Sequence, residues 1–144
     1  MTLTKILLAT DGSANSLHAA EWMADHFDHN NTIIHIVTVV EPLSQATRAT
    51  YMGWSTTLAA NHMSVDAQEV LRITQLRLPN FRATNSVCHG EPVSQILEQS
   101  HSISPDLIVV GHRGLHGVDR FFMGSVAKSL VHRARTPILV IPQQ

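Results

Sequence analysis

Short apolar runs rich in β-branched residues alternate along this chain with longer stretches whose apolar residues recur at helical spacing. Such runs fit buried strands, and apolar residues three and four apart fit amphipathic helices. The runs that we predict to be strands cover residues 5–9, 32–40, 82–88, 107–110 and 138–141. Because strands that alternate with helices are joined by crossovers, the pattern predicts a parallel sheet covered on both faces. We therefore expect one open, doubly wound α/β domain with five parallel strands, spanning residues 1–144.

The helical stretches predict which residues face the sheet. In the first helix, over residues 14–27, the apolar positions are Leu17, Ala20, Ala24 and Phe27. A longer helix is expected over residues 56–78, with Pro79 ending it because proline cannot continue a helix. Two further helices are expected, one beginning near Pro92 and one over residues 125–133.

Composition and charge exclude several classes of function. Hydrophobic residues make up 44% of the 144 residues, which is enough to bury one core. The formal net charge is -1 and only Arg133 and Arg135 lie close together among the basic residues, so we expect no nucleic-acid partner. The apolar run Ile6–Ala9 is too short for a signal peptide, and no stretch approaches the roughly 20 residues that cross a bilayer. With Cys88 as its one cysteine, the chain is expected to be cytoplasmic, with no membrane partner.

Ten histidines are dispersed over the chain, and no pair forms a metal-ligand motif. We interpret them as solvated surface residues that gain positive charge as the pH falls toward about 6. Cys88 and His89 are adjacent, but neighbours on a strand point to opposite faces, so they are not expected to act as a nucleophile and its base.

Two loops are expected to meet at one edge of the sheet. Ligands of open parallel sheets bind beyond the carboxyl ends of the strands, where the strand order reverses. In most doubly wound sheets the first strand neighbours the strand that starts the second half, which here begins at Leu107. The loops in question are then Thr10–Ser13 and the one that begins at Gly111.

The second loop carries a Gly-x2-Gly-x9-Gly-Ser pattern formed by Gly111, Gly114, Gly124 and Ser125. Glycine lets backbone N–H groups approach a phosphate, and the helix expected from Ser125 offers free N–H donors and a partial positive charge. The Ser125 hydroxyl adds a donor, and Asp11 could hold a ribose or a Mg²⁺ shared with phosphate oxygens. The pattern follows a strand and precedes a helix, which favours a phosphate cradle over glycines that serve turns alone.

Four segments carry a family resemblance: Lys5–Ser13, Gly90–Pro92, Pro105–Gly111 and Thr136–Pro142. Together with the glycine pattern, they resemble the universal stress protein family along nearly the whole chain. Members of that family that bind ATP are marked by the same glycine spacing. The resemblance implies the sheet order 3-2-1-4-5, which agrees with the meeting of loops expected above.

The resemblance also implies contacts for individual residues. Asp11 would lie beside the nucleotide, Val39 would contact the adenine, Val110 would line the pocket, and Val126 would offer its amide to a phosphate. Ala9 and Thr10, where the first strand runs into its loop, complete the expected set. The cofactors implied are ATP and Mg²⁺, with Asp11 as the candidate metal ligand.

The chain departs from the family at His112 and Arg113, where small residues are common. Arg113 has two interpretations, a clamp on a phosphate and a side chain in solvent. The stretch 41–55 is long for a connection and would overhang the adenine, with Tyr51 and Trp54 either forming a lid or packing on the next helix.

The expected function is that of an ATP-binding stress-response regulator, a binder or switch rather than an efficient enzyme. Related folds that hydrolyse or transfer nucleotides use motifs that this chain lacks, and a phosphorelay receiver needs an aspartate where the chain has Cys88. A slow ATPase and a protein-interaction module with a structural nucleotide remain alternatives.

The last strand, Ile138–Ile141, is apolar throughout and lies between Pro137 and Pro142, so we expect a homodimer that pairs this strand with its copy.

Overall fold

Strands and helices alternate along the chain in the computed structural model, which describes residues 3–41, 56–112 and 123–143, with the backbone alone for residues 56–65. The elements are β1 (Thr4–Ala9), α1 (Ala14–His26), β2 (Thr32–Val40), α3 (Thr56–Gln75), β3 (Arg82–His89), α4 (Pro92–Ile103), β4 (Leu107–Gly111), α5 (Ser125–Arg133) and β5 (Ile138–Ile141). Neighbouring strands pair in parallel, in the order β3-β2-β1-β4-β5. The predicted fold class and strand order are confirmed.

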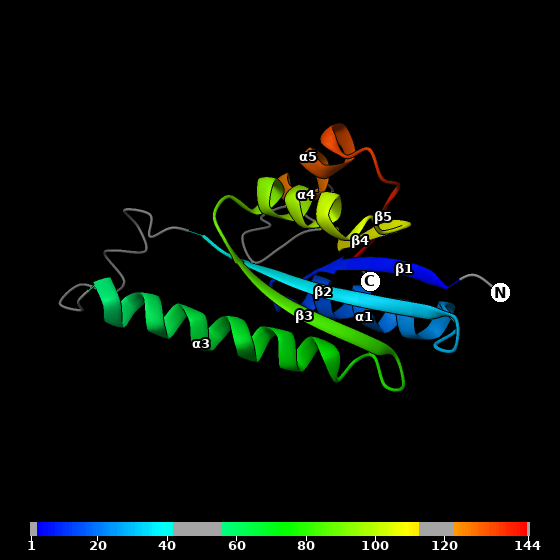
Figure 1. Ribbon diagram of the computed structural model, residues 1–144, viewed down its shortest axis with the longest axis horizontal. Helices are drawn as coiled ribbons and strands as arrows, with labels where there is room; N and C mark the ends of the chain where they lie inside the picture. Colours follow the sequence, from blue (N-terminus) through cyan, green and yellow to red (C-terminus); the bar gives the residue numbers. More distant parts are fainter. Residues whose placement is uncertain (1–2, 42–55, 113–122, 144) are drawn as a thin grey trace.

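Helices cover the sheet on both faces (Figure 1). Ile6 and Leu8 of β1 point toward α1 and α3, where they pack with Met23 and Leu71. Leu7, between them, points to the opposite face and packs beneath α4 and α5. Because successive side chains of a strand alternate in direction, a central strand buried on both sides has to be apolar throughout.

The buried stripe of α1 differs from the predicted one. Its buried residues are Ser16, Ala19, Ala20 and Met23. Of the predicted residues, Ala20 is buried, whereas Leu17, Ala24 and Phe27 are half-buried, and Ala24 and Phe27 pack at the margin of the same core. The small residues bring the backbone of α1 close to the sheet, a preference that apolar spacing alone does not reveal.

The predicted end of α3 is also corrected. The helix ends at Gln75 rather than Leu78, because the N–H groups of Arg77 and Leu78 bond to carbonyls three residues back and tighten the chain into a turn. Proline disfavours the helical conformation in the residue before it, which here is Leu78. Leu78 is 2% exposed and turns into the core. No helix within the described ranges has the length and apolar character needed to span a membrane.

The edge strand β3 departs from the expectation of a sheet covered on both faces. It pairs with β2 over its whole length. On the face shared with α4, Arg82 and Thr84 are exposed, Ser86 is half-buried, and Cys88 alone is buried. The opposite face packs Ala83 and Val87 against the core beneath α3. The weak alternation in the sequence of β3 therefore reflects a strand that has one polar, largely uncovered side.

Candidate functional site

The loops that follow β1 and β4 begin next to each other at the carboxyl edge of the sheet. β4 pairs in parallel with β1, which pairs with β2 on its other side. After β1, the chain adds β2 and then β3 on one side of β1. The next strand, β4, pairs with the opposite side of β1. The strand order therefore reverses between β1 and β4, the position at which open parallel sheets bind ligands.

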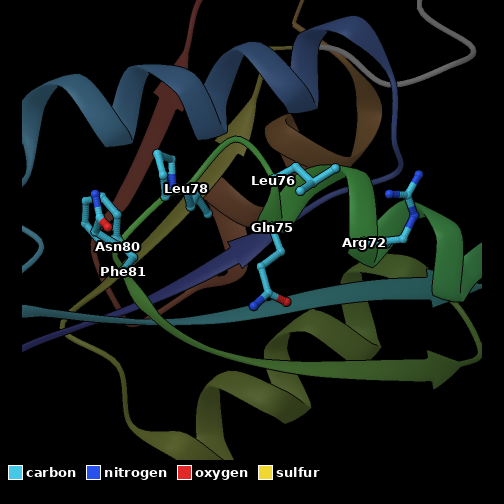
Figure 2. Close-up of a pocket in the computed structure, with 7 residues that line it drawn as sticks. Arg72, Gln75, Leu76, Leu78, Asn80 and Phe81 are labelled. Carbon is cyan, nitrogen blue, oxygen red and sulfur yellow. The ribbon is translucent and has the colours of Figure 1, made fainter.

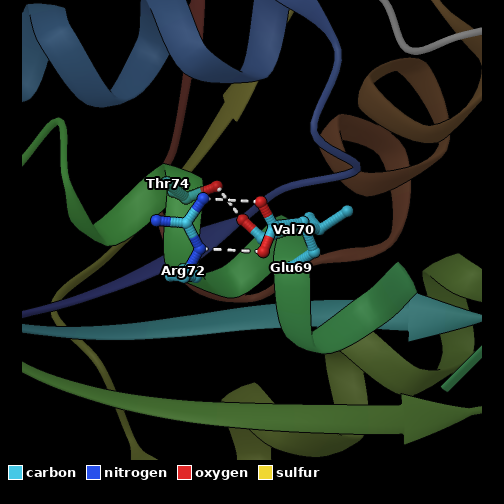
Figure 3. A network of polar contacts seen from close by, with 4 residues as sticks. All are labelled: Glu69, Val70, Arg72 and Thr74. Atoms are coloured by element: carbon cyan, nitrogen blue, oxygen red, sulfur yellow. Dashed lines mark hydrogen bonds and ion pairs between the residues drawn. The ribbon is translucent and has the colours of Figure 1, made fainter. Parts of the chain in front are cut away.

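The loop after β1 is anchored on α3. Oγ1 of Thr10 lies 3.0 Å from Oγ1 of Thr74. The Thr74 hydroxyl donates to the carbonyl of Val70 at 2.7 Å (Figure 3). The N–H of Gly12 donates to the Thr10 hydroxyl at 3.2 Å. Gly12 has a φ of +78°, and a Cβ there would lie 3.0 Å from a methyl group of Val70, so glycine is required by the turn. The Thr10 hydroxyl is thus hydrogen-bonded within the fold before any ligand arrives.

Asp11 organises the first turn of α1. Its Oδ1 accepts hydrogen bonds from the N–H of Ser13 at 2.9 Å and from the hydroxyl of Ser16 at 2.8 Å. Ser13 is the N-cap, and its hydroxyl accepts from the N–H of Ser16. No group of three or more His, Cys, Asp or Glu residues suited to a metal gathers within the described ranges.

The helices α1, α4 and α5 differ in how their N-termini are capped. Ser13 caps α1, and Glu91 caps α4 by accepting from the N–H groups of Val93 and Ser94 at 3.1 and 2.7 Å. Gly124 stands at the N-cap of α5, and no side chain within the described residues bonds to the first N–H groups of this helix. The first N–H groups of a helix have no partner within it and attract an anion. The N-terminus of α5 therefore keeps donors available for an external anion.

Gly111 is confined by α1. A Cβ on this residue would lie 2.9 Å from the backbone carbon and oxygen of Asn15 and 3.1 Å from the nitrogen of Ser16. Real Cβ atoms do not approach backbone so closely, so the first turn of α1 could not sit where it does beside a larger residue. Glycine at this position serves the packing of α1 against β4, apart from any approach of a phosphate.

His112 connects the end of β4 to the start of α5. Its carbonyl oxygen accepts a hydrogen bond from the N–H of Gly124 at 2.8 Å. Its side-chain Nδ1 is buried, and no hydrogen-bond partner for it exists in the part of the chain that the structure describes. A buried polar atom left without a partner costs about 1–3 kcal/mol. The residue next to the anion-attracting end of α5 thus holds an unsatisfied polar atom.

The apolar candidates divide by exposure. Val39, at the carboxyl end of β2, and Val126, in the first turn of α5, are half-buried. Ala9 and Val110 are 9% and 4% exposed and belong to the core beneath α4 and α5. Val39 and Val126 therefore keep part of their surface exposed, whereas Ala9 and Val110 are covered by the core.

Comparison with known proteins decides the family. The model of the universal stress protein family matches residues 2–142. The chain belongs to the universal stress protein family. A universal stress protein of Methanocaldococcus jannaschii is 29% identical over 142 residues, covering 95% of this chain and 81% of the relative. A Mycobacterium tuberculosis relative is also 29% identical, and the chain spans 48% of its length.

Solved structures of low sequence identity share the fold. A protein whose biochemical function was assigned from its structure superposes with a TM-score of 0.82 at 18% identity, over 100% of this chain and 99% of its own. A universal stress protein in complex with cAMP has a TM-score of 0.65 at 21% identity, with 99% and 98% coverage. An Arabidopsis thaliana member of the family with AMP bound has a TM-score of 0.64 at 18% identity, with 98% and 92% coverage.

Part of the predicted site lies beyond what the structure describes. Arg113 and Gly114 fall outside the described residues, as do Tyr51 and Trp54 of the connection after β2. The structure brings together Asp11, Gly111, His112 and the N-terminus of α5 through the pairing of β1 with β4 and the contact of Gly111 with α1.

Two residues at the site were missed by sequence reasoning. Ser16 bonds to Asp11, and the backbone of Asn15 touches Gly111. A signal for Ser16 existed, since a serine three residues after the N-cap Ser13 can join an N-terminal hydrogen-bond network. No local signal marks Asn15, because its contact depends on how α1 packs on β4.

A pocket of about 390 Å³ lies away from this region, at the turn between α3 and β3 (Figure 2). Residues that line it include Leu76, Leu78 and Phe81. The turn precedes β3 and therefore lies at the amino edge of the parallel sheet, opposite the loops after β1 and β4. Arg72, at its rim, is paired with Glu69 by two hydrogen bonds, and the Arg72 guanidinium lowers the pKa of that carboxyl (Figure 3).

Proposed function

We propose that this chain binds an adenine nucleotide, ATP, at the carboxyl ends of β1 and β4. The observation that carries the proposal is the N-terminus of α5, which no side chain of the described residues caps. The hydrogen bond from Gly124 to His112 holds this N-terminus beside the end of β4. The capped N-termini of α1 and α4 already bond to side chains of their own chain and make weaker anion sites. The polyphosphate is therefore assigned to α5.

The proposed contacts follow from this placement. Backbone N–H groups of the glycine loop and of the first turn of α5 hold the phosphates, Val39 contacts the base, and Asp11 holds the ribose or a Mg²⁺. Ala9, Thr10 and Val110 form the floor. The full set that we assign to the nucleotide is Ala9, Thr10, Asp11, Val39, Val110, Gly111, Arg113, Gly114, Gly124, Ser125 and Val126.

Structural neighbours support an adenine ligand. One is in complex with cAMP and another has AMP bound. Both ligands combine adenine with a single phosphate, so the base and the first phosphate have precedents on this fold. We extend the proposal to ATP and Mg²⁺ because of the glycine spacing and because the first N–H groups of α5 are available as donors.

We further propose that the protein acts as a cytoplasmic regulator that binds ATP rather than as an efficient enzyme. Oδ1 of Asp11 already accepts two hydrogen bonds, so its position suits a ligand better than a base that activates water. A slow ATPase is the alternative, and the rate of ATP turnover separates the two.

Residues 1–144 are proposed to work as a single domain, with no nucleic-acid or membrane partner and with a second copy paired along β5.

The proposal is tested by titrating ATP, GTP and AMP into the purified protein by calorimetry with millimolar Mg²⁺. We expect ATP to bind more tightly than GTP and to raise the melting temperature, because a ligand that binds the native state stabilises it by mass action. Gly124→Val should abolish binding, since the new side chain would enter the region where phosphates meet α5.

Val131→Ala is a matched control, because Val131 is exposed two turns further along the same helix. It should bind ATP like the wild type. Lack of ATP binding by the wild type would refute the proposal, and a folded Gly124→Val variant with unchanged affinity would move the phosphates away from α5.

A further inference from the structure

The Nδ1 atom of the His112 imidazole makes no hydrogen bond within the residues that the structure describes. This atom is buried, and it is the one side-chain nitrogen or oxygen found buried without a partner over residues 3–41, 66–112 and 123–143. Folded proteins satisfy the large majority of their buried polar atoms, so an exception calls for a reason. A group that a ligand completes is one such reason.

The backbone of His112 is held in place on both sides. Gly111, before it, lies against the backbone of Asn15, and the carbonyl of His112 bonds to the N–H of Gly124 at 2.8 Å. The residue therefore cannot move away from the N-terminus of α5 without unpacking α1 or breaking that bond. The side chain is attached to this fixed backbone, and a change of its rotamer breaks no hydrogen bond of Nδ1 within the described residues.

We propose that His112 donates a hydrogen bond from its ring to the phosphate chain of the bound nucleotide, which makes it a residue that selects for phosphorylated ligands. This inference rests on the proposed function. Phosphate oxygens accept hydrogen bonds, and an imidazole N–H is a donor whether the ring is neutral or cationic. In the proposed site the first backbone N–H groups of α5 hold the same anion, and His112 adds a side-chain donor to them. Adenosine, which has no phosphate, gains nothing from this contact.

The test compares the wild type with His112→Leu and His112→Asn. Calorimetry gives the affinities for ATP and adenosine, and thermal unfolding without nucleotide gives the stability. The leucine variant should melt no lower than the wild type, because it replaces an unsatisfied polar atom with an apolar group of similar size. Its ATP affinity should fall about tenfold, the factor that corresponds to one hydrogen bond of about 1.4 kcal/mol, while its adenosine affinity stays unchanged.

The remaining variants identify the cause of the effect. His112→Asn keeps an N–H donor close to the position of Nδ1 and should retain most of the ATP affinity. His132→Leu, at the other end of α5 and exposed, should leave both affinities unchanged. If the leucine variant does not fold, His112→Ser removes the ring and takes its place in the comparison.

Each outcome decides the matter. A lower melting temperature of His112→Leu with unchanged ATP affinity would make the residue structural and overturn the inference. Equal losses for ATP and adenosine would do so too, since the phosphates would then not be its target. If the wild type binds no ATP, the proposed function fails and this inference with it. If the wild type and all His112 variants bind ATP equally, only the assignment of His112 fails.

Discussion

The imidazole of His35 lies half-buried between β2 and the edge strand β3, not in solvent as predicted. Its Nδ1 is 2.5 Å from the hydroxyl of Thr84, and its Nε2 is 2.8 Å from the hydroxyl of Ser86. Burial lowers the pKa of His35, and a hydrogen bond with Gln99 of α4 offsets part of that effect. The neutral ring thus links two strands through both of its nitrogens on the polar side of β3.

We expect His35 to make the fold less stable in mild acid. At neutral pH and above, the ring is neutral whether the chain is folded or unfolded. Below the ordinary pKa of 6.5, the unfolded chain takes up a proton that the folded protein resists. Stability is therefore lost as the pH falls from about 6.5 to the lower pKa of the folded state, with a slope of at most about 1.4 kcal/mol per pH unit.

Urea unfolding of the wild type and His35→Gln at pH 5, 6, 7 and 8 measures this contribution. The glutamine variant keeps a polar side chain but cannot titrate, so its stability should fall less between pH 7 and 5. Parallel pH profiles for the two proteins would contradict the expectation. His101→Gln, in the last turn of α4 and exposed, serves as the control for removing a histidine as such.

At the scale of elements, α4 and α5 lie together on one face of the sheet but begin differently. The carboxylate of Glu91 accepts from the first N–H groups of α4, and its hydrogen bonds with Ser94, followed by that with Val93, lower the pKa of Glu91. Over residues 3–41, 66–112 and 123–143, no side chain does the same for α5. The N-terminus of α4 is therefore capped by its own chain, whereas the first N–H groups of α5 remain available to an anion.

Glu91→Ala should lower the free energy of unfolding by about 1 kcal/mol, the usual loss when an N-cap is removed. Ser125→Ala, at the start of α5, should change the stability little, because that helix has no side-chain cap to lose. Urea unfolding at pH 7 compares the two variants. The loss in Glu91→Ala should shrink in acid below the ordinary pKa of glutamate, where the wild-type carboxylate is also protonated. If both variants lose a similar free energy of unfolding, the two helices do not differ in how much their N-terminal side chains stabilise them.

At the scale of the whole molecule, the sheet ends in two edge strands of different character. β3 has eight residues with a polar side, whereas β5 has four apolar residues bounded by Pro137 and Pro142. Ile138, Leu139 and Val140 are half-buried in the single chain, so β5 leaves apolar surface at the edge. Edges of this kind are usually covered or paired, and a short strand that meets its own copy requires one self-complementary patch.

We expect a homodimer through β5, with a mass near twice the 15.9 kDa of the chain by light scattering on a sizing column at tens of micromolar. Val140→Lys places a charge on the edge strand and should yield monomers that retain native circular dichroism. Val131→Lys makes the same exchange at an exposed position of α5 and should remain dimeric. A wild-type mass near 15.9 kDa would contradict the dimer, and dissociation by Val131→Lys alone would move the interface to α5.

Much of the architecture could be predicted from local patterns. The alternation of apolar runs with helical spacing placed the ends of all five strands to within one residue. The central strand β1 was marked most clearly, because a strand buried on both faces has to be apolar at nearly every position. The end of α3 and the buried face of α1 were predicted less well. A turn that tightens before Pro79 and a helix that approaches the sheet through Ser16, Ala19 and Ala20 both depend on what the helix packs against.

The sequence by itself determined the order of the elements, the parallel sheet and the loops in which chemistry-bearing residues occur, since these follow from periodicity and from the chain rules of α/β folds. The tertiary structure alone decided what individual residues do there. The glycine spacing predicts a phosphate cradle, yet the contact of Gly111 with Asn15 shows that packing against α1 also requires that glycine. Nδ1 of His112 is buried without a hydrogen-bond partner in the described residues, and the ring of His35 contacts two hydroxyl groups of β3. Both environments are formed by residues from distant parts of the chain, so no local sequence pattern encodes them.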